Sequence, residues 1–161
     1  MMKFFLLALI AGFGASLHAQ QQYDMNYASF RDFIREEMSD EEFRSVDAYF
    51  EGHIEGLVCT YEYGDFSGDD EDELVILTSE PTFDHSRKIN VYIFTSRPNG
   101  KFEFVDKLTY SYWKDRYEVA ILIRRGVLFI TNASSDYSEW TWNLYRIKDE
   151  KLDFLKKEVY N

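Results

Sequence analysis

The chain has 161 residues, a formal net charge of −11 at pH 7 and an aromatic content of 18%. This aromatic content excludes a disordered chain, because disordered segments carry few large apolar side chains. The strong acidity argues against DNA, RNA and anionic membrane surfaces as partners, and it suits a cation, a basic protein partner or simple solubility.

The first 19 residues have the pattern of a secretory signal peptide. Lys3 provides a basic start, an apolar run extends from Phe4 to Leu17, and Ala19 is a small residue at the expected cleavage site. The run has 14 residues, fewer than the roughly 20 that a membrane-spanning helix needs, so cleavage is favoured over an anchor. Removing 19 of 161 residues leaves 142, and the charge becomes −12 because Lys3 is lost. We therefore expect a single secreted or periplasmic domain at residues 20–161.

Two short amphipathic helices are predicted at the start of this domain. Residues 26–38 and 39–50 each place apolar side chains at helical spacing. Ser39 followed by Glu42 is a capping box, which marks the start of the second helix. This helix should stop at Gly52, and the pair is expected to cover a sheet as a lid.

From Leu57 onward the apolar residues alternate with the period of a β-strand. Turn sequences such as Asn99-Gly100 separate the alternating segments. The expected strands are 57–63, 73–78, 88–95, 102–108, 117–124, 127–131, 139–147 and 152–157. They predict a mostly β (α+β) domain of antiparallel hairpins that form a sandwich-like or curled sheet. Each half, 57–108 and 117–157, has four strands, which leaves an internal duplication open.

The segment "YGDFSGDDEDELVIL" places a run of acids directly before a predicted strand. Oxygen-bearing side chains recur at alternate positions, and calcium prefers six to eight oxygen ligands. The candidate ligands are Asp65, Ser67, Asp69, Glu71 and Glu73. The loop is not an EF-hand, because position 12 is Ile76 and a strand follows instead of a helix. The alternative is a solvated acidic turn.

This segment resembles the calcium loop of FG-GAP and VCBS-type repeats, which are found in integrin-type propellers and many secreted bacterial proteins. The resemblance covers about residues 61–95, and it rests on Asp65, Asp69, Glu73 and the apolar strand that follows. The sequence departs from the pattern at Ser67, where Asn or Asp is usual. It also departs at Asp70, where Gly is usual because the position needs a positive φ. The resemblance implies one structural calcium ion but no propeller, which would need several repeats.

Residue types that carry catalysis are few. Only His53 and His85 remain after cleavage, and the triad residue types at 84–86 are adjacent in sequence, so they cannot converge as a relay. Cys59 lies in an alternating apolar context near acids, so we expect a buried strand residue and no nucleophile. The inventory favours a non-enzymatic protein. A small secreted hydrolase stays open as an alternative, because two carboxylates need only be close in space.

The aromatic residues suggest a binding surface. Trp140 and Trp142 alternate with polar residues and should point to one face of a strand. Leu144 continues that face, which favours the core side over an exposed one. Tyr112 and Trp113 form a second candidate contact surface near a turn. The leading hypothesis is a binding protein for another protein, for example an inhibitor or immunity-type protein for a basic enzyme. A carbohydrate-binding module that uses the tryptophans is the alternative.

Overall fold

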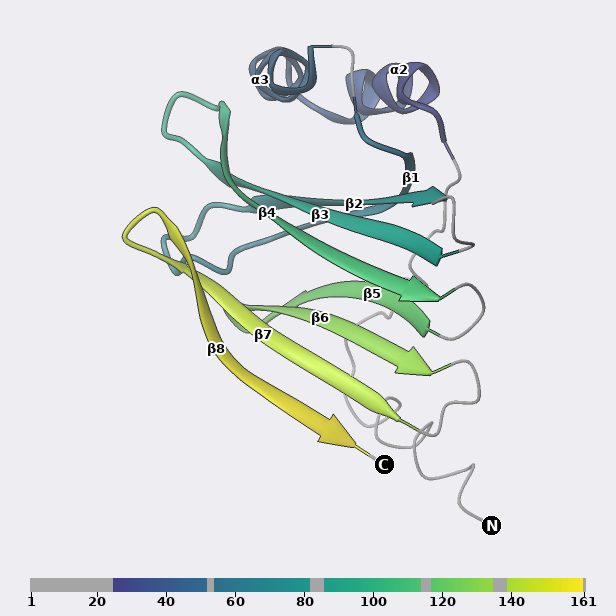
Figure 1. Ribbon diagram of the computed structural model, residues 1–161. Coiled ribbons are helices and arrows are strands. Elements are labelled where there is room, and N and C mark those ends of the chain that lie inside the picture. The colour runs from purple at the N-terminus through teal and green to yellow at the C-terminus, as the bar shows by residue number, and fades with distance from the viewer. Residues whose placement is uncertain (1–24, 52–53, 82–85, 114–116, 135–138, 161) are drawn as a thin grey trace.

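The computed structural model describes residues 25–51, 54–81, 86–113, 117–134 and 139–160. Its fold has three layers: two helices lie over one face of a first sheet, and a second sheet lies under the other face (Figure 1). Both sheets are four-stranded and antiparallel, and they do not close into a barrel. The predicted mostly β fold, with its N-terminal helical lid, is confirmed.

The second of the two helices begins at the side-chain cap that the sequence predicts. The helices are α2 (Tyr27–Glu37) and α3 (Asp40–Phe50). The capping box of α3 is present, since the Ser39 hydroxyl accepts the Glu42 N–H at 3.3 Å and the Glu42 carboxylate accepts the Ser39 N–H at 2.8 Å. Gly52, the expected stop, lies outside the described residues. Across the described residues, no helix has both the length and the apolar character needed to cross a membrane.

All eight expected strands are present, and within each sheet every strand pairs with the next one along the chain. The first sheet contains β1 (Leu57–Gly64), β2 (Glu73–Pro81), β3 (Ser86–Ser96) and β4 (Phe102–Trp113). The second sheet contains β5 (Tyr117–Arg124), β6 (Val127–Ser134), β7 (Trp140–Lys148) and β8 (Lys151–Tyr160). The two four-strand halves of the sequence are therefore the two sheets, each folded as a meander.

The first sheet is buried on both of its faces, so the fold has two cores. On β2, Leu74 and Ile76 pack toward the helices, while Val75 and Leu77 pack toward the second sheet. Successive residues of a strand point to opposite faces, which explains why the β2 sequence is apolar without interruption. The core between the sheets also contains four buried residues of the second sheet: Ile121, Leu128, Ile130 and Ile147. Cys59 is buried in that core, as predicted.

The two sheets contact each other along both sides of the sandwich. On one side β1 lies beside β5, and Gly64 permits this contact because a Cβ there would lie only 2.7 Å from Cγ2 of Ile123. On the other side β4 faces β8, and the hydroxyls of Tyr110 and Tyr145 lie 3.2 Å apart. In Figure 1, β4 and β8 form the near edges of the two sheets.

Candidate functional site

The acidic loop connects β1 to β2 and is built around the carboxylate of Asp65. One oxygen of this carboxylate accepts the N–H groups of Ser67 at 3.1 Å and Gly68 at 2.6 Å. The other oxygen accepts the N–H of Asp70 at 3.3 Å. Such side-chain to backbone bonds let Asp hold a tight turn. Asp65, a predicted calcium ligand, thus acts as the acceptor that organises the loop.

Glu73, the last predicted ligand, is fully buried at the start of β2. Its carboxylate accepts the backbone N–H groups of Phe66 at 2.8 Å and Ser67 at 3.0 Å, and the Thr95 hydroxyl at 3.3 Å. Burial raises the pKa of Glu73, and the hydrogen bonds from the loop partly oppose this rise. A buried carboxylate needs such donors. The side chain of Glu73 on β2 receives them from the loop backbone and from Thr95 on β3.

Phe66 joins the acidic loop to the second sheet. Its side chain is 1% exposed and belongs to the inter-sheet core. Its carbonyl oxygen accepts the N–H of Ile147 on β7 at 3.0 Å. The loop is therefore anchored across both sheets, although its acids at positions 69–72 are exposed. Phe66 was not predicted as a core residue. The only sign of its burial in the sequence is that it is a large apolar residue next to a run of acids.

One residue of the loop, Asp70, has a left-handed backbone. Asp70 has φ +68°, and it stands where the repeat pattern has glycine. A left-handed backbone is strained for residues with a side chain, although Asp tolerates it better than most. The expected positive φ at this position is thus confirmed.

Asp70→Gly is expected to raise the free energy of unfolding by about 0.5–1 kcal/mol, because glycine adopts this φ without strain. Asp72→Gly is the matched control: it removes the same charge from the same loop at a residue without positive φ. Urea denaturation of both variants measures the difference. Equal changes in the two variants would show that loop charge, not backbone strain, controls the stability.

The predicted calcium ligands do not converge on one point in this conformation. Asp65 and Glu73 are engaged with loop N–H groups, the Ser67 hydroxyl donates to Asp65 at 3.4 Å, and Asp69 and Glu71 are exposed. Among the residues that the structure describes, no group of three or more His, Cys, Asp or Glu side chains is placed to hold a metal ion. A calcium ion would therefore have to redirect these carboxylates, and calcium binding stays a prediction.

A cleft of about 610 Å³ lies beside the loop, where the β3–β4 and β7–β8 turns approach it. Arg97 bridges these two hairpins, with ion pairs to Glu103 at 2.6 Å and Glu150 at 2.8 Å. Arg146 on the cleft wall pairs with Asp153 at 3.2 Å. The charges of the cleft thus hold the two hairpins together, and they provide no argument for a particular ligand.

Most of the predicted catalytic and aromatic candidates fall outside the described parts. This holds for His53 and His85, and for the side chains of Tyr112, Trp113 and Trp140, whose strands are described.

Trp142 lies on the outer face of the second sheet, so the expectation that it continues the core side is wrong. On β7, Tyr145 and Ile147 face the inter-sheet core, and alternation turns Trp142 and Leu144 the other way. The pairing agrees, because Leu144 lies opposite Phe129 on β6, whereas Tyr145 lies opposite the buried Leu128.

An apolar group covers this outer face, and we call it the outer-face cluster. Its members come from all four strands of the second sheet: Leu122, Phe129, Trp142, Leu144 and Tyr160. The Trp142 ring lies 5.6 Å from that of Phe129 and 6.0 Å from that of Tyr160, measured between centroids. Leu122 is 38% and Tyr160 52% exposed, Phe129 and Trp142 are half-buried, and Leu144 is buried with 7% exposed. No helix or strand among the described residues lies over this face.

Comparison of the chain with protein-family models, curated proteins and solved structures found no match. The functional argument therefore rests on the residues and on the geometry.

Proposed function

We propose that this protein is a secreted or periplasmic binding protein that holds another protein against the outer-face cluster. The observation that carries the proposal is the contrast between the sheets. The first sheet is covered on both faces, and the second sheet has an aromatic outer face without a covering element among the described residues. Contiguous exposed apolar patches mark interaction sites, and Trp and Tyr dominate the binding energy of protein interfaces.

The ring geometry favours a protein partner over a glycan. The Trp142 ring meets the Phe129 ring at 88° and the Tyr160 ring at 59°, so the three rings do not form a flat platform. A sugar stacks on ring faces, and a row of edge-to-face rings presents few of them. A convex apolar group of a protein would fit such an uneven surface better.

The charge distribution indicates an apolar partner for this face. Residues 117–160 contain seven Lys and Arg and seven Asp and Glu, so the second sheet is neutral overall. Residues 25–113 contain eight Lys and Arg and twenty Asp and Glu. The acidity lies in the helices, the first sheet and the acidic loop. The prediction of a basic partner therefore applies to that half of the molecule, and the outer-face cluster supports a neutral, apolar contact.

A matched pair of leucine variants tests the proposal. The wild-type protein is used to isolate its partner from the secreted and envelope fractions, and the affinity of the purified partner is then measured by titration calorimetry. Leu122→Ser is expected to weaken binding by about tenfold or more, since it removes an apolar contact from the cluster. Leu57→Ser removes a leucine of similar exposure, 42%, from the first sheet and should leave the affinity unchanged.

Two results would contradict the proposal. Equal affinities of the Leu122→Ser and Leu57→Ser variants would place the contact elsewhere on the molecule. Failure to isolate a protein partner, together with retention of the wild-type protein on a polysaccharide column, would favour the carbohydrate-binding alternative. Quenching of the tryptophan fluorescence by a glycan, lost in Trp142→Phe, would then identify the ring that stacks on the sugar.

A further inference from the structure

Strand β8 is an edge strand with an unusual amount of exposed apolar surface. It pairs with β7 on one side, and among the described residues no strand pairs with its other side (Figure 1). Four large apolar side chains on it are exposed: Phe154 by 53%, Leu155 by 38%, Val159 by 52% and Tyr160 by 52%. The unpaired backbone groups of an edge strand are a template for pairing with another strand.

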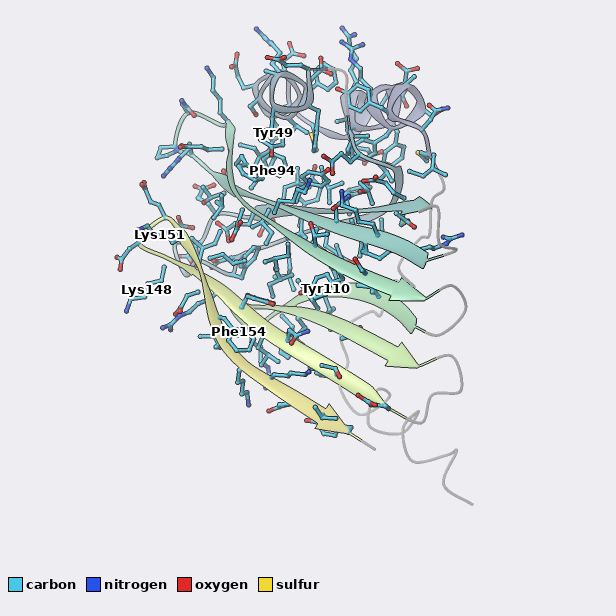
Figure 2. All side chains as sticks on the ribbon, in the orientation of Figure 1. Tyr49, Phe94, Tyr110, Lys148, Lys151 and Phe154 are labelled. Carbon is cyan, nitrogen blue, oxygen red and sulfur yellow. The ribbon has the colours of Figure 1, made fainter. Side chains whose placement is uncertain are left out.

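The edge strands β1 and β5 are better covered than β8. The backbone of Val58 on β1 exchanges two hydrogen bonds with Met25, at 2.9 and 3.1 Å. Strand β5 lies next to β1, where Ile123 packs against Gly64. Strand β8, in contrast, forms a near edge of the molecule in Figure 1, and Figure 2 shows Phe154 on it.

We infer that β8 pairs antiparallel with β8 of a second copy of this chain, around a two-fold axis that passes through Lys157. The two second sheets would then join into one eight-stranded sheet. In an antiparallel pair, residues directly opposite each other point to the same face. Neighbouring residues of a strand point to opposite faces, so a two-fold axis must pass through a residue and not between two.

The axis at Lys157 gives the most favourable contacts across the new pair. Lys156 and Glu158 both lie on the outer face, opposite Leu144 and Trp142 of β7, and within one chain they form an ion pair with each other. With this axis, Lys156 of each copy faces Glu158 of the other, which makes two pairs of opposite charge. An axis at Lys156 or at Glu158 would place two like charges together and lose both of these pairs.

The bulge of β8 aligns the apolar residues in the same register. The pairing with β7 shifts between Leu144 and Tyr145, which leaves Leu155 as the extra residue of β8. As a result Phe154 and Val159 lie on the same face, because their partners Tyr145 and Thr141 on β7 do. Phe154 of each copy then contacts Val159 of the other. The like-charged Lys157 pair on the axis opposes these gains, but both side chains are exposed and flexible.

The dimer does not rest on the proposed binding function. Since the axis is perpendicular to the sheet, both outer-face clusters would lie on the same side of the eight-stranded sheet. A partner with two identical sites, or a large flat partner, would then contact both clusters at once.

Sedimentation equilibrium of the purified protein tests the pairing through a charge exchange. The wild-type protein is expected to show a monomer–dimer equilibrium. Lys156→Glu should weaken the dimer by about tenfold, because it places like charges opposite each other twice. The double variant Lys156→Glu/Glu158→Lys should recover the wild-type dissociation constant. Lys151→Glu is the matched control, since Lys151 lies at the end of β8 beyond the pairing, and should dimerise as the wild type does.

A crosslinking measurement tests the axis independently of the charge variants. Lys157→Cys places two thiols on the axis, and mild oxidation should link two chains through a disulfide. Lys151→Cys should give no linked dimer. A protein that is monomeric at every concentration, a Lys156→Glu variant that dimerises like the wild type, a double variant that fails to recover, or a Lys157→Cys variant that stays unlinked would each overturn this pairing.

Discussion

Replacing Glu73 with alanine is expected to lower the free energy of unfolding by about 3 kcal/mol. The substitution leaves the N–H of Phe66 without its acceptor, and an unsatisfied buried donor costs roughly 1–3 kcal/mol. The N–H of Ser67 loses one of its two carboxylate acceptors and keeps Asp65. The Thr95 hydroxyl loses one of its two acceptors as well, and it keeps the carbonyl oxygen of Ser96. Urea denaturation followed by circular dichroism measures the change.

Glu73→Gln separates the role of the hydrogen bonds from the role of the charge. The glutamine oxygen can accept both loop N–H groups, and its NH₂ group can donate to the Thr95 hydroxyl oxygen. We therefore expect Glu73→Gln to retain most of the stability that Glu73→Ala loses. Equal losses in the two variants would show that the negative charge itself is required, as for a metal ligand.

The same pair of variants tests the calcium prediction. A site with a dissociation constant one hundredth of the calcium concentration would stabilise the fold by about 2.7 kcal/mol, which raises Tm by several degrees. Melting curves in EDTA, calcium and magnesium measure this rise. A calcium-specific rise that is lost in Asp65→Ala and in Glu73→Gln would establish the loop as a metal site. The absence of a rise would leave the loop as a turn organised by two carboxylates.

The pH dependence of stability provides a further check on Glu73. Burial raises its pKa above the ordinary value of 4.5, so the folded protein binds this proton more tightly than the unfolded chain does. Stability from this proton is fully present below pH 4.5 and is lost as the pH rises through the folded pKa. The unfolding free energy of the wild type relative to Glu73→Gln should therefore fall with rising pH above 4.5. A difference that is constant with pH would contradict a raised pKa.

The strands could be predicted from the sequence because the turns between them have strong signals. Gly126, with φ +71°, and the preceding Arg125, with φ +52°, form a two-residue turn between β5 and β6. The three-layer order could also be anticipated in part, since β2 and β3 are apolar on both faces and need cover on both sides.

The orientation of β7 could not be predicted, because both alternating sets of its residues are apolar. In "WTWNLYRIK", Trp142 and Leu144 form one set, and Tyr145 and Ile147 form the other. Alternation alone does not decide which set is buried. The decision depends on pairing with β6 and on packing against the first sheet, and these are contacts between distant parts of the chain.

The role of the acidic loop could be predicted only in part, because a carboxylate that binds a cation and one that accepts N–H groups need the same residue type. The run of acids located the turn, and the resemblance to a calcium loop implied the positive φ that Asp70 has. It could not show that Glu73 would be fully buried, since this depends on Thr95 of β3 and on the second sheet.

Phe66→Ala is expected to cost about 3–5 kcal/mol of unfolding free energy, since it removes an aromatic side chain that is 1% exposed from the inter-sheet core. Phe66→Leu should cost clearly less, because it fills much of the same space. The alanine variant should also speed hydrogen exchange of the Ile147 amide, which donates to the Phe66 carbonyl.

Phe154→Ala, measured on dilute protein, is the control for an exposed phenylalanine. If Phe66→Ala lost no more stability than this control and left the Ile147 amide protected, the loop would not depend on the core for its position. Its conformation would then be set by Asp65 and Glu73 alone.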